Sequence, residues 1–280
     1  MKLIHTLLFM LRADKLQEDI AMAEICLRSL EKSTYKDVIV YNQGALTNEQ
    51  TENFLHVFNL NCTVIGSAFN VGIVAGRKAC FEHVWNNLPE AAYISEIHLD
   101  MIFAPNWEDA LVEYLGDNDE PVVSSGIVDK EGVLNFLDVP PVPLPTDSGS
   151  YGEFLTGLRR DIIVHGFTHP CVHKSAVFRA VGGYNTDFLK GKQCFEDDSI
   201  LLGYYYYYGT NADWHPKVNY NTVAYHALAA QRLDLHDSIM PNYNGLVRQY
   251  GAMGQKHLAH LHRCPWHKNF FTQKYNEMLL

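Results

Sequence analysis

The sequence predicts an α/β fold in which helices cover both faces of a mostly parallel sheet. Three observations lead to this prediction. Short apolar segments alternate with amphipathic segments along residues 3–128. The apolar segments are almost unbroken, as in strands that are buried on both faces. Hydrophobic residues make up 47% of the 280 residues and charged residues 19%, which is enough apolar surface for a large core.

The first strand is expected over residues 3–11, and a helix follows it. Apolar side chains recur in this helix at the spacing of one helical face, from Leu16 to Leu30. Asp14 and Gln17 are spaced as a capping box at its start.

A second strand is predicted over residues 37–42. Thr47 and Gln50 then have the spacing of another capping box, which predicts that a helix begins there. Further strands are expected over 62–66, 92–99 and 121–128, and further helices over 71–88 and 105–115.

The second half of the chain begins with a change of composition. Residues 138–151 are rich in Pro, Ser and Gly, which predicts a flexible loop or flap. Beyond it we expect a strand at 169–173, helices at 174–181 and 195–208, and a mostly helical end from 229 onward. The expected division is a main domain, 1–228, with halves 1–128 and 129–228, and a helical C-terminal extension, 229–280.

The charge and the cysteines exclude several classes of protein. The chain has 22 Lys and Arg against 32 Asp and Glu, a formal charge of -10, which disfavours a nucleic-acid or anionic-membrane binder. The six cysteines form no C-x-x-C pair, which favours reduced thiols and a cytoplasmic protein. His5 interrupts the apolar start, and no run approaches the roughly 20 residues of a membrane helix, so we expect neither a signal peptide nor a transmembrane segment.

Candidate functional residues follow the predicted strands, because ligands of open parallel sheets bind at the carboxyl ends of the strands. His98 and Asp100 come after one strand, and residues two apart in an extended segment point to the same side. An imidazole and a carboxylate suit Mn²⁺, or Mg²⁺. The alternative is a strand-end histidine beside an aspartate that caps a helix.

Two further segments carry charge at predicted helix starts. In the segment 70–78, glycines precede Arg77 and Lys78, which could neutralise a diphosphate or form a surface pair. The segment matches neither a P-loop nor a dinucleotide fingerprint. Glu196, Asp197 and Asp198 open another helix, where acids either complement the helix dipole or supply a general base.

The order of these motifs resembles a known family. The turn at residues 41–44, the glycines and arginine of 70–77, His98-x-Asp100, the Gly-Gly-Tyr of 182–184, Glu196-Asp197 and His226 follow one another along the chain. This series is similar to that of GT-A glycosyltransferases of family 2. The resemblance covers roughly residues 3–230.

The resemblance implies a metal-dependent enzyme that moves a single sugar from a UDP- or GDP-linked donor to a hydroxyl of a glycan or glycoconjugate, with inversion. It implies that Asp197 is the catalytic base and that Asp100, His226 and His98 form the metal site for Mn²⁺ or Mg²⁺. Contacts with the nucleotide sugar are expected at Arg12, Asn42, Asn70, Arg77, His98 and Asp100. Contacts on the acceptor side are expected at His169, Glu196 and Trp214.

Two departures from the family pattern keep alternatives open. His98 stands where the family has the first acid of its D-x-D motif, and Asn42 replaces the usual nucleoside-binding aspartate. A retaining GT-A transferase, or a sugar-binding relative without catalysis, would share these motifs. The sequence lacks the Q-x-x-R-W pattern of processive synthases and the Gly-rich basic signature of nucleotidyltransferases.

Overall fold

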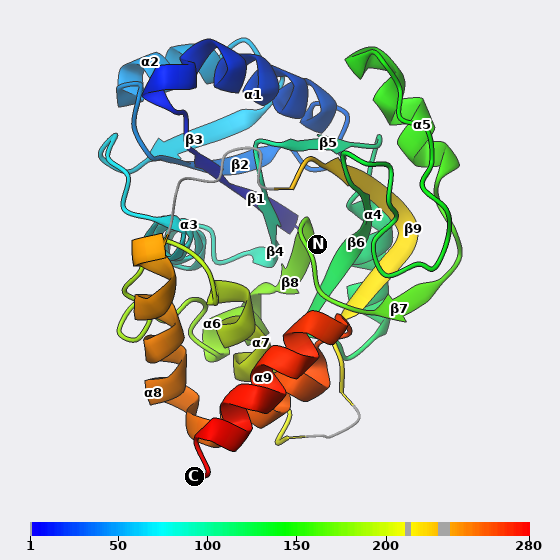
Figure 1. The fold of residues 1–280 in the computed structure, drawn as a ribbon. Helices are drawn as coiled ribbons and strands as arrows, with labels where there is room; N and C mark the ends of the chain where they lie inside the picture. Colours follow the sequence, from blue (N-terminus) through cyan, green and yellow to red (C-terminus); the bar gives the residue numbers. More distant parts are fainter. Residues whose placement is uncertain (1, 211–213, 229–235) are drawn as a thin grey trace.

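The computed structural model describes residues 2–210, 214–228 and 236–280 (Figure 1). The start of the predicted C-terminal extension, residues 229–235, lies outside the described residues. The first half of the chain forms β1 (Lys2–Phe9), α1 (Leu16–Leu30), β2 (Asp37–Asn42), α2 (Asn48–Leu55), β3 (Asn61–Ile65), α3 (Ile73–Asn87), β4 (Ala91–Ile97), β5 (Met101–Phe103), α4 (Asp109–Asp117) and β6 (Val122–Val128). The second half forms α5 (Tyr151–Gly157), β7 (Ile163–His165), β8 (Cys171–Lys174), α6 (Ser175–Ala180), α7 (Glu196–Tyr207), β9 (Lys217–His226), α8 (His236–Leu261) and α9 (Pro265–Glu277).

The strands form one sheet in the order β3-β2-β1-β4-β8-β6-β9-β5, and β7 pairs with β9. β1 is parallel to β2 and β4, and β6 is parallel to β9, while β8 runs antiparallel between β4 and β6. Six strands therefore share one direction, which confirms the mostly parallel sheet. Their carboxyl ends, and the amino end of β8, meet at the same edge.

Helices cover both faces of this sheet, as the alternation of side chains along β2 demonstrates. Val38 and Val40 pack into a core with residues of α1, α2 and α4. Ile39 and Tyr41 point to the opposite face, into a core shared with α3, α6, α7, α8 and α9. The three layers follow from the period of two in a strand that is apolar on both sides.

The two predicted capping boxes have different outcomes. Thr47 and Gln50 form the box at the start of α2, with each side chain bonded to the other's backbone amide. The box predicted at Asp14 is wrong, because residues 13–15 form a 3-10 turn and α1 begins only after it, without a side-chain cap.

The Pro-rich segment 138–151 is packed against its neighbours. The amide of Val142 donates to the carbonyl of Gly132 over 2.9 Å, and Val139 and Leu144 contact the small core cluster around β9. The segment ends in a 3-10 turn, Ser148–Ser150, where the amide and the hydroxyl of Ser150 donate to the Asp147 carboxylate. These contacts tie parts of the segment to the body of the protein, and its flexibility stays a prediction.

Two further observations bear on the sequence predictions. All six cysteines are free thiols, as their spacing predicts. Among the described residues, no helix is both long enough and apolar enough to cross a membrane.

Candidate active site

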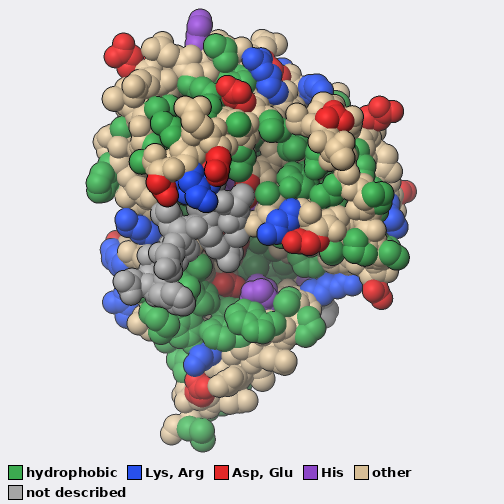
Figure 2. All heavy atoms as spheres, turned by 45° about the horizontal axis from the view of Figure 1, so that its top comes forward, with side chains coloured by type: hydrophobic (Ala, Val, Ile, Leu, Met, Phe, Trp, Pro, Cys, Tyr) green, Lys and Arg blue, Asp and Glu red, His purple; other side chains and the backbone are tan. Residues whose placement is uncertain are grey.

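A cavity of about 600 Å³ opens at the edge where the carboxyl ends of the parallel strands meet. The ends of β1 and β4, the start of α3, the segment before α7 and one side of α9 line it. A hollow with acidic and histidine side chains inside it and hydrophobic side chains around it is visible in Figure 2. Its volume is that of a site for a small molecule.

His98, Asp100 and His226 meet in this cavity. β4 ends at Ile97, so the next residues turn at the edge of the sheet, and β5 then pairs with the end of β9 in a register that places Met101 opposite His226. His226 Nε2 lies 3.3 Å from Asp100 Oδ1. One ligand atom of each of the three residues lies within 4.8 Å of the others.

These three side chains fit a divalent cation. Two imidazoles and one carboxylate are donors that Mn²⁺ accepts. Burial, and then the neighbouring His169, Arg77 and His226, hold the pKa of His98 well below its usual value, so the ring is neutral and able to ligate. Within the described part of the chain, the buried Nδ1 of His226 has no hydrogen-bond partner.

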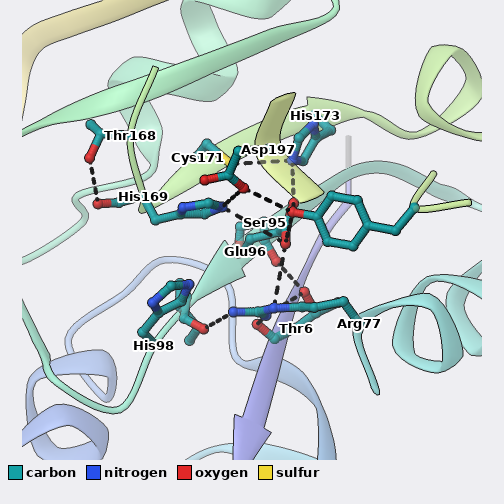
Figure 3. A network of polar contacts seen from close by, with 12 residues as sticks. Thr6, Arg77, Ser95, Glu96, His98, Thr168, His169, Cys171, His173 and Asp197 are labelled. Atoms are coloured by element: carbon teal, nitrogen blue, oxygen red, sulfur yellow. Dashed lines mark hydrogen bonds and ion pairs between the residues drawn. The ribbon is translucent and has the colours of Figure 1, made fainter. Parts of the chain in front are cut away.

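A buried carboxylate, Glu96, organises the floor beneath this group (Figure 3). It lies 2.9 Å from His173 Nε2, 3.0 Å from the Tyr184 hydroxyl and 3.4 Å from Arg77 Nε. Burial alone would raise the pKa of Glu96, but the hydrogen bond from His173 and the charges of His169 and Arg77 lower it to about 2. Glu96 is therefore a fixed negative charge at neutral pH.

Asp197 lies above this floor in the first turn of α7. Its Oδ1 is 3.4 Å from the Tyr184 hydroxyl and 3.8 Å from His169 Nε2, and 43% of its side chain is exposed to the cavity. Desolvation of the Asp197 carboxylate by the protein around it, and then the nearby carboxylates of Glu196 and Glu96, raise its pKa well above the usual value. A carboxylate of raised pKa that faces a cavity is suited to accept a proton.

His169 lies between His98, one of the three residues that fit a cation, and Asp197. It lies two residues before β8, the antiparallel strand whose amino end lies at the same edge of the sheet as the cavity. Its ring stacks on His98 at a centroid distance of 4.8 Å, while its Nε2 faces Asp197. Burial lowers the pKa of His169 to about 3, so this ring is neutral at pH 7.

Most of the predicted site residues line the cavity. They are Asn70, Arg77, His98, Asp100, His169, Glu196, Asp197 and His226.

The structure corrects the role expected for Arg77. Its Nη1 and Nη2 each donate over 2.6 Å to the carbonyls of Thr6 and Ile97, and only 2% of the side chain is exposed. Arg77 thus holds the ends of β1 and β4 together and compensates Glu96. A guanidinium committed to these groups has little capacity left for a diphosphate.

Arg12, Asn42 and Trp214 are not among the described residues that line the cavity. The Arg12 guanidinium forms an ion pair with Asp19, and the Asn42 amide is bonded within its own turn. Trp214 is 6% exposed and donates to Glu120. Local partners satisfy the side chain at each of these three positions, and the ligand contacts expected there stay predictions. Residues 138–151 do not line the cavity either.

Sequence reasoning missed Glu96 and the aromatic residues of α9. Glu96 had a detectable signal, since it is an acid inside an otherwise apolar strand, and a buried acid needs a specific partner. Trp266 and Phe270 line the cavity from a helix about 170 residues further along the chain. No local pattern could have placed them there.

Comparisons with known proteins address the fold. No family model and no curated protein match this sequence. Solved structures of S. aureus TarS match it at 11–12% identity. One S. aureus TarS structure superposes with a TM-score of 0.57 over 98% of this chain, which spans 43% of the TarS chain in that structure. The TarS 1–349 structures in complex with UDP and with UDP-GlcNAc have TM-scores of 0.56 and 0.55, over 93% and 98% of this chain and 70% and 71% of theirs.

At this identity the likeness is one of fold. The superposition extends over nearly the whole chain, including the helices α8 and α9 that follow the sheet. Together with the mostly parallel sheet and the cavity at its carboxyl edge, it shows that this chain has the GT-A-like α/β fold that TarS has.

Proposed function

We propose that this protein is a metal-dependent glycosyltransferase that moves a single sugar from a nucleotide-diphosphate sugar to a hydroxyl of a glycan or glycoconjugate. One observation carries the proposal: His98, Asp100 and His226 converge within 4.8 Å, and they share one cavity with Asp197. A site for a divalent cation beside a carboxylate of raised pKa provides both halves of such a transfer.

Asp100, His226 and His98 would hold Mn²⁺ or Mg²⁺ on the donor side. When bound, the ion neutralises charge that develops on a leaving diphosphate. Lys192 is exposed and lines the cavity next to the start of α3, so we assign to it the phosphate contact that the sequence assigned to Arg77. Asn70 lines the same side.

Asp197 is the proposed general base. It takes the proton of the acceptor hydroxyl while the oxygen forms a bond to the anomeric carbon and the bond from that carbon to the diphosphate breaks. The proton ends on the Asp197 carboxylate, and the diphosphate leaves with the bonding electrons. Attack from the face opposite the leaving group inverts the anomeric centre. His169 and Glu196 lie beside Asp197 on the acceptor side.

The TarS complexes suggest which donor to test first. Their structures hold UDP and UDP-GlcNAc, and this chain has the same fold at 11–12% identity. We therefore propose a UDP-linked donor, with UDP-GlcNAc as the first compound to assay.

The donor half is tested by titration calorimetry of UDP with and without Mn²⁺. We expect Mn²⁺ to strengthen UDP binding at least tenfold in the wild type and to have little effect in Asp100→Asn, because a removed carboxylate weakens the cation site. UDP affinity that is independent of Mn²⁺ in the wild type would remove the metal from the proposal.

The catalytic half is tested with Asp197→Asn and, as a matched loss of charge at an exposed position, Asp187→Asn. Removing a general base lowers turnover by about 10²- to 10⁴-fold. We expect that loss in the hydrolysis of UDP-GlcNAc by Asp197→Asn, with UDP affinity within a factor of two. Turnover near that of the wild type would exclude Asp197 as the base.

A further inference from the structure

The helix α9 brings an aromatic wall to the cavity that the proposed chemistry does not use. Phe195 directly precedes Glu196, and its ring stacks on Phe270 at 6.4 Å and 27°. Phe270 in turn stacks on Trp266 at 5.6 Å and 10°. All three residues line the cavity. The rings therefore form a series that begins beside the proposed base and ends at Trp266.

Trp266 is the exposed end of this series. It is 66% exposed, whereas the other three tryptophans, Trp85, Trp107 and Trp214, are at most 8% exposed. Phe270 stacks on its indole and His267 meets the same ring edge-on at 4.9 Å and 88°, and these two contacts leave most of the side chain exposed. A large aromatic ring held open to water in a cavity is unfavourable unless a ligand covers it.

His262, in the turn between α8 and α9, links α9 to the start of α7 and holds this wall in place. His262 lies 2.6 Å from Asp198, in the first turn of α7, and its ring stacks on His267 at 4.8 Å and 14°. Phe271, which is fully buried, also stacks on the His262 ring, at 5.4 Å. Trp266 is therefore fixed relative to the turn that carries Asp197. This is the acceptor side of the cavity, whereas Met10 and Gln43 line it at the ends of β1 and β2.

We propose that Trp266, supported by Phe270, is a platform on which a gluco-configured pyranose ring of the acceptor stacks. A ring whose hydroxyls are equatorial presents axial C–H groups on both faces, and these faces are apolar enough to pack against an indole. The exposed rims of the sugar keep their hydroxyls free for hydrogen bonds. The assignment of this platform to the acceptor rests on the proposed function, whereas the stacking of a sugar ring on Trp266 does not.

Trp266 provides a direct optical test, because it is the one exposed tryptophan of the four. Iodide quenching of the wild type should report mainly on Trp266, and Trp266→Phe should lose most of the quenchable emission. We expect cellobiose to protect the wild type from iodide and sorbitol, an open-chain polyol without a ring face, to give no protection. Equal protection by both compounds, or none by cellobiose, would overturn the proposal.

Calorimetry supplies the second readout. Trp266→Ala should weaken cellobiose binding about five- to tenfold, the range of a lost aromatic contact, and Trp266→Phe should retain most of the affinity. Tyr207→Ala, an exposed aromatic at the far end of α7, is the matched control and should bind as the wild type does. Unchanged cellobiose affinity in Trp266→Ala would refute the platform.

The same variants separate this inference from the proposed function. UDP with Mn²⁺ should bind Trp266→Ala and the wild type equally, and it should not protect Trp266 from iodide. Protection by UDP alone would assign the ring to the donor and overturn the acceptor subsite. Failure of UDP to bind any variant, with cellobiose still protecting Trp266, would count against the transferase and leave the stacking site standing.

Discussion

Two carboxylates at the centre of the site have opposite environments. Glu96 is surrounded by Arg77, His173 and the Tyr184 hydroxyl. Burial would raise its pKa, but the hydrogen bond from His173 and the charges of His169 and Arg77 lower it to about 2. Asp197 is close to other acids, and its pKa is raised. Carboxylates whose pKa values are pushed apart within one site are typical of acid–base chemistry.

The direction in which each pKa is shifted determines how stability or activity changes with pH. The ionised form of Glu96 stabilises the fold at pH values above the ordinary pKa of 4.5, and that stability is lost as the pH falls toward about 2. The proposed role of Asp197 as a base requires its ionised form. Its activity is therefore lost as the pH falls through its raised pKa.

A change at Glu196 tests this account. The Glu196 carboxylate raises the pKa of Asp197, so Glu196→Gln should lower that pKa and move the acidic limb of the pH–rate profile for UDP-GlcNAc turnover to lower pH. Glu153→Gln removes an exposed acid on α5 and should leave the limb in place. A limb that stays fixed in Glu196→Gln, or moves to higher pH, would contradict the electrostatic argument.

At the scale of the elements, two similar capping-box patterns in the sequence differ in whether they stabilise the start of a helix. Thr47 makes the side-chain bond of a capping box, whereas Asp14 has similar spacing but lies inside a 3-10 turn. The pattern of residue types was the same at both places. Only the backbone conformation distinguishes them.

The capping difference predicts a difference in stability. Thr47→Ala should lower the free energy of unfolding by about 1 kcal/mol, because an amide at the start of α2 loses its acceptor. Asp14→Ala should change it by less than about 0.5 kcal/mol. Urea unfolding measures both, and an equal loss in the two variants would contradict the assignment of the caps.

Gly72 fixes the start of α3 against the segment that walls the cavity. Its φ is +87°, and an added Cβ would lie 2.7 Å from the Cα of Lys192. The next amide, of Ile73, donates to the Lys192 carbonyl over 2.6 Å. This close approach of two backbones requires glycine.

Gly72→Ala should therefore push Lys192 away and weaken the binding of UDP with Mn²⁺ by about tenfold or more, an amount equivalent to about 1.4 kcal/mol. Gly209→Ala is the matched control. Its φ is +72°, so it has the same backbone strain, but none of the atoms that the structure describes lies within 4 Å of an added Cβ. Calorimetry of both variants separates the displacement of Lys192 from backbone strain at the substituted glycine. Equal UDP affinity in the two variants would refute a role for the contact between Gly72 and Lys192.

At the scale of the whole molecule, α8 and α9 belong to the same core as the sheet. Leu246, Leu258 and Phe271 pack in one cluster with residues of α3 and α7. Figure 1 shows these C-terminal helices beside α7, below the sheet in that view. The predicted extension is therefore part of the packing that supports the site.

Phe271 tests how much this packing contributes. It is fully buried, so Phe271→Ala should lower the free energy of unfolding by about 3–5 kcal/mol. Phe69→Ala removes the same ring from a position that is 68% exposed and should cost less than about 0.5 kcal/mol. A small loss in Phe271→Ala would indicate that α9 is only weakly attached.

The sequence predicted the part of the molecule that depends on local periodicity. β1 to β4 and the helices between them are close to their expected ranges, because an apolar strand or an amphipathic helix is readable from neighbouring residues. The short strands β5 and β7 and the strand β9 were missed. Their pairing partners are distant in the chain, and their apolar runs are brief or interrupted.

For the site, the sequence by itself singled out His98, Asp100, Asp197 and His226 as candidates, since His98 and Asp100 follow a predicted strand, Asp197 opens a predicted helix and His226 follows an apolar segment. Only the tertiary structure decided which of the candidates meet. The parallel direction of β4 and β9 brings His226 to Asp100, and neighbouring carbonyls occupy Arg77. Whether a polar side chain serves a ligand or its own neighbours depends on contacts made after the chain has folded, and spacing along the sequence does not contain that information.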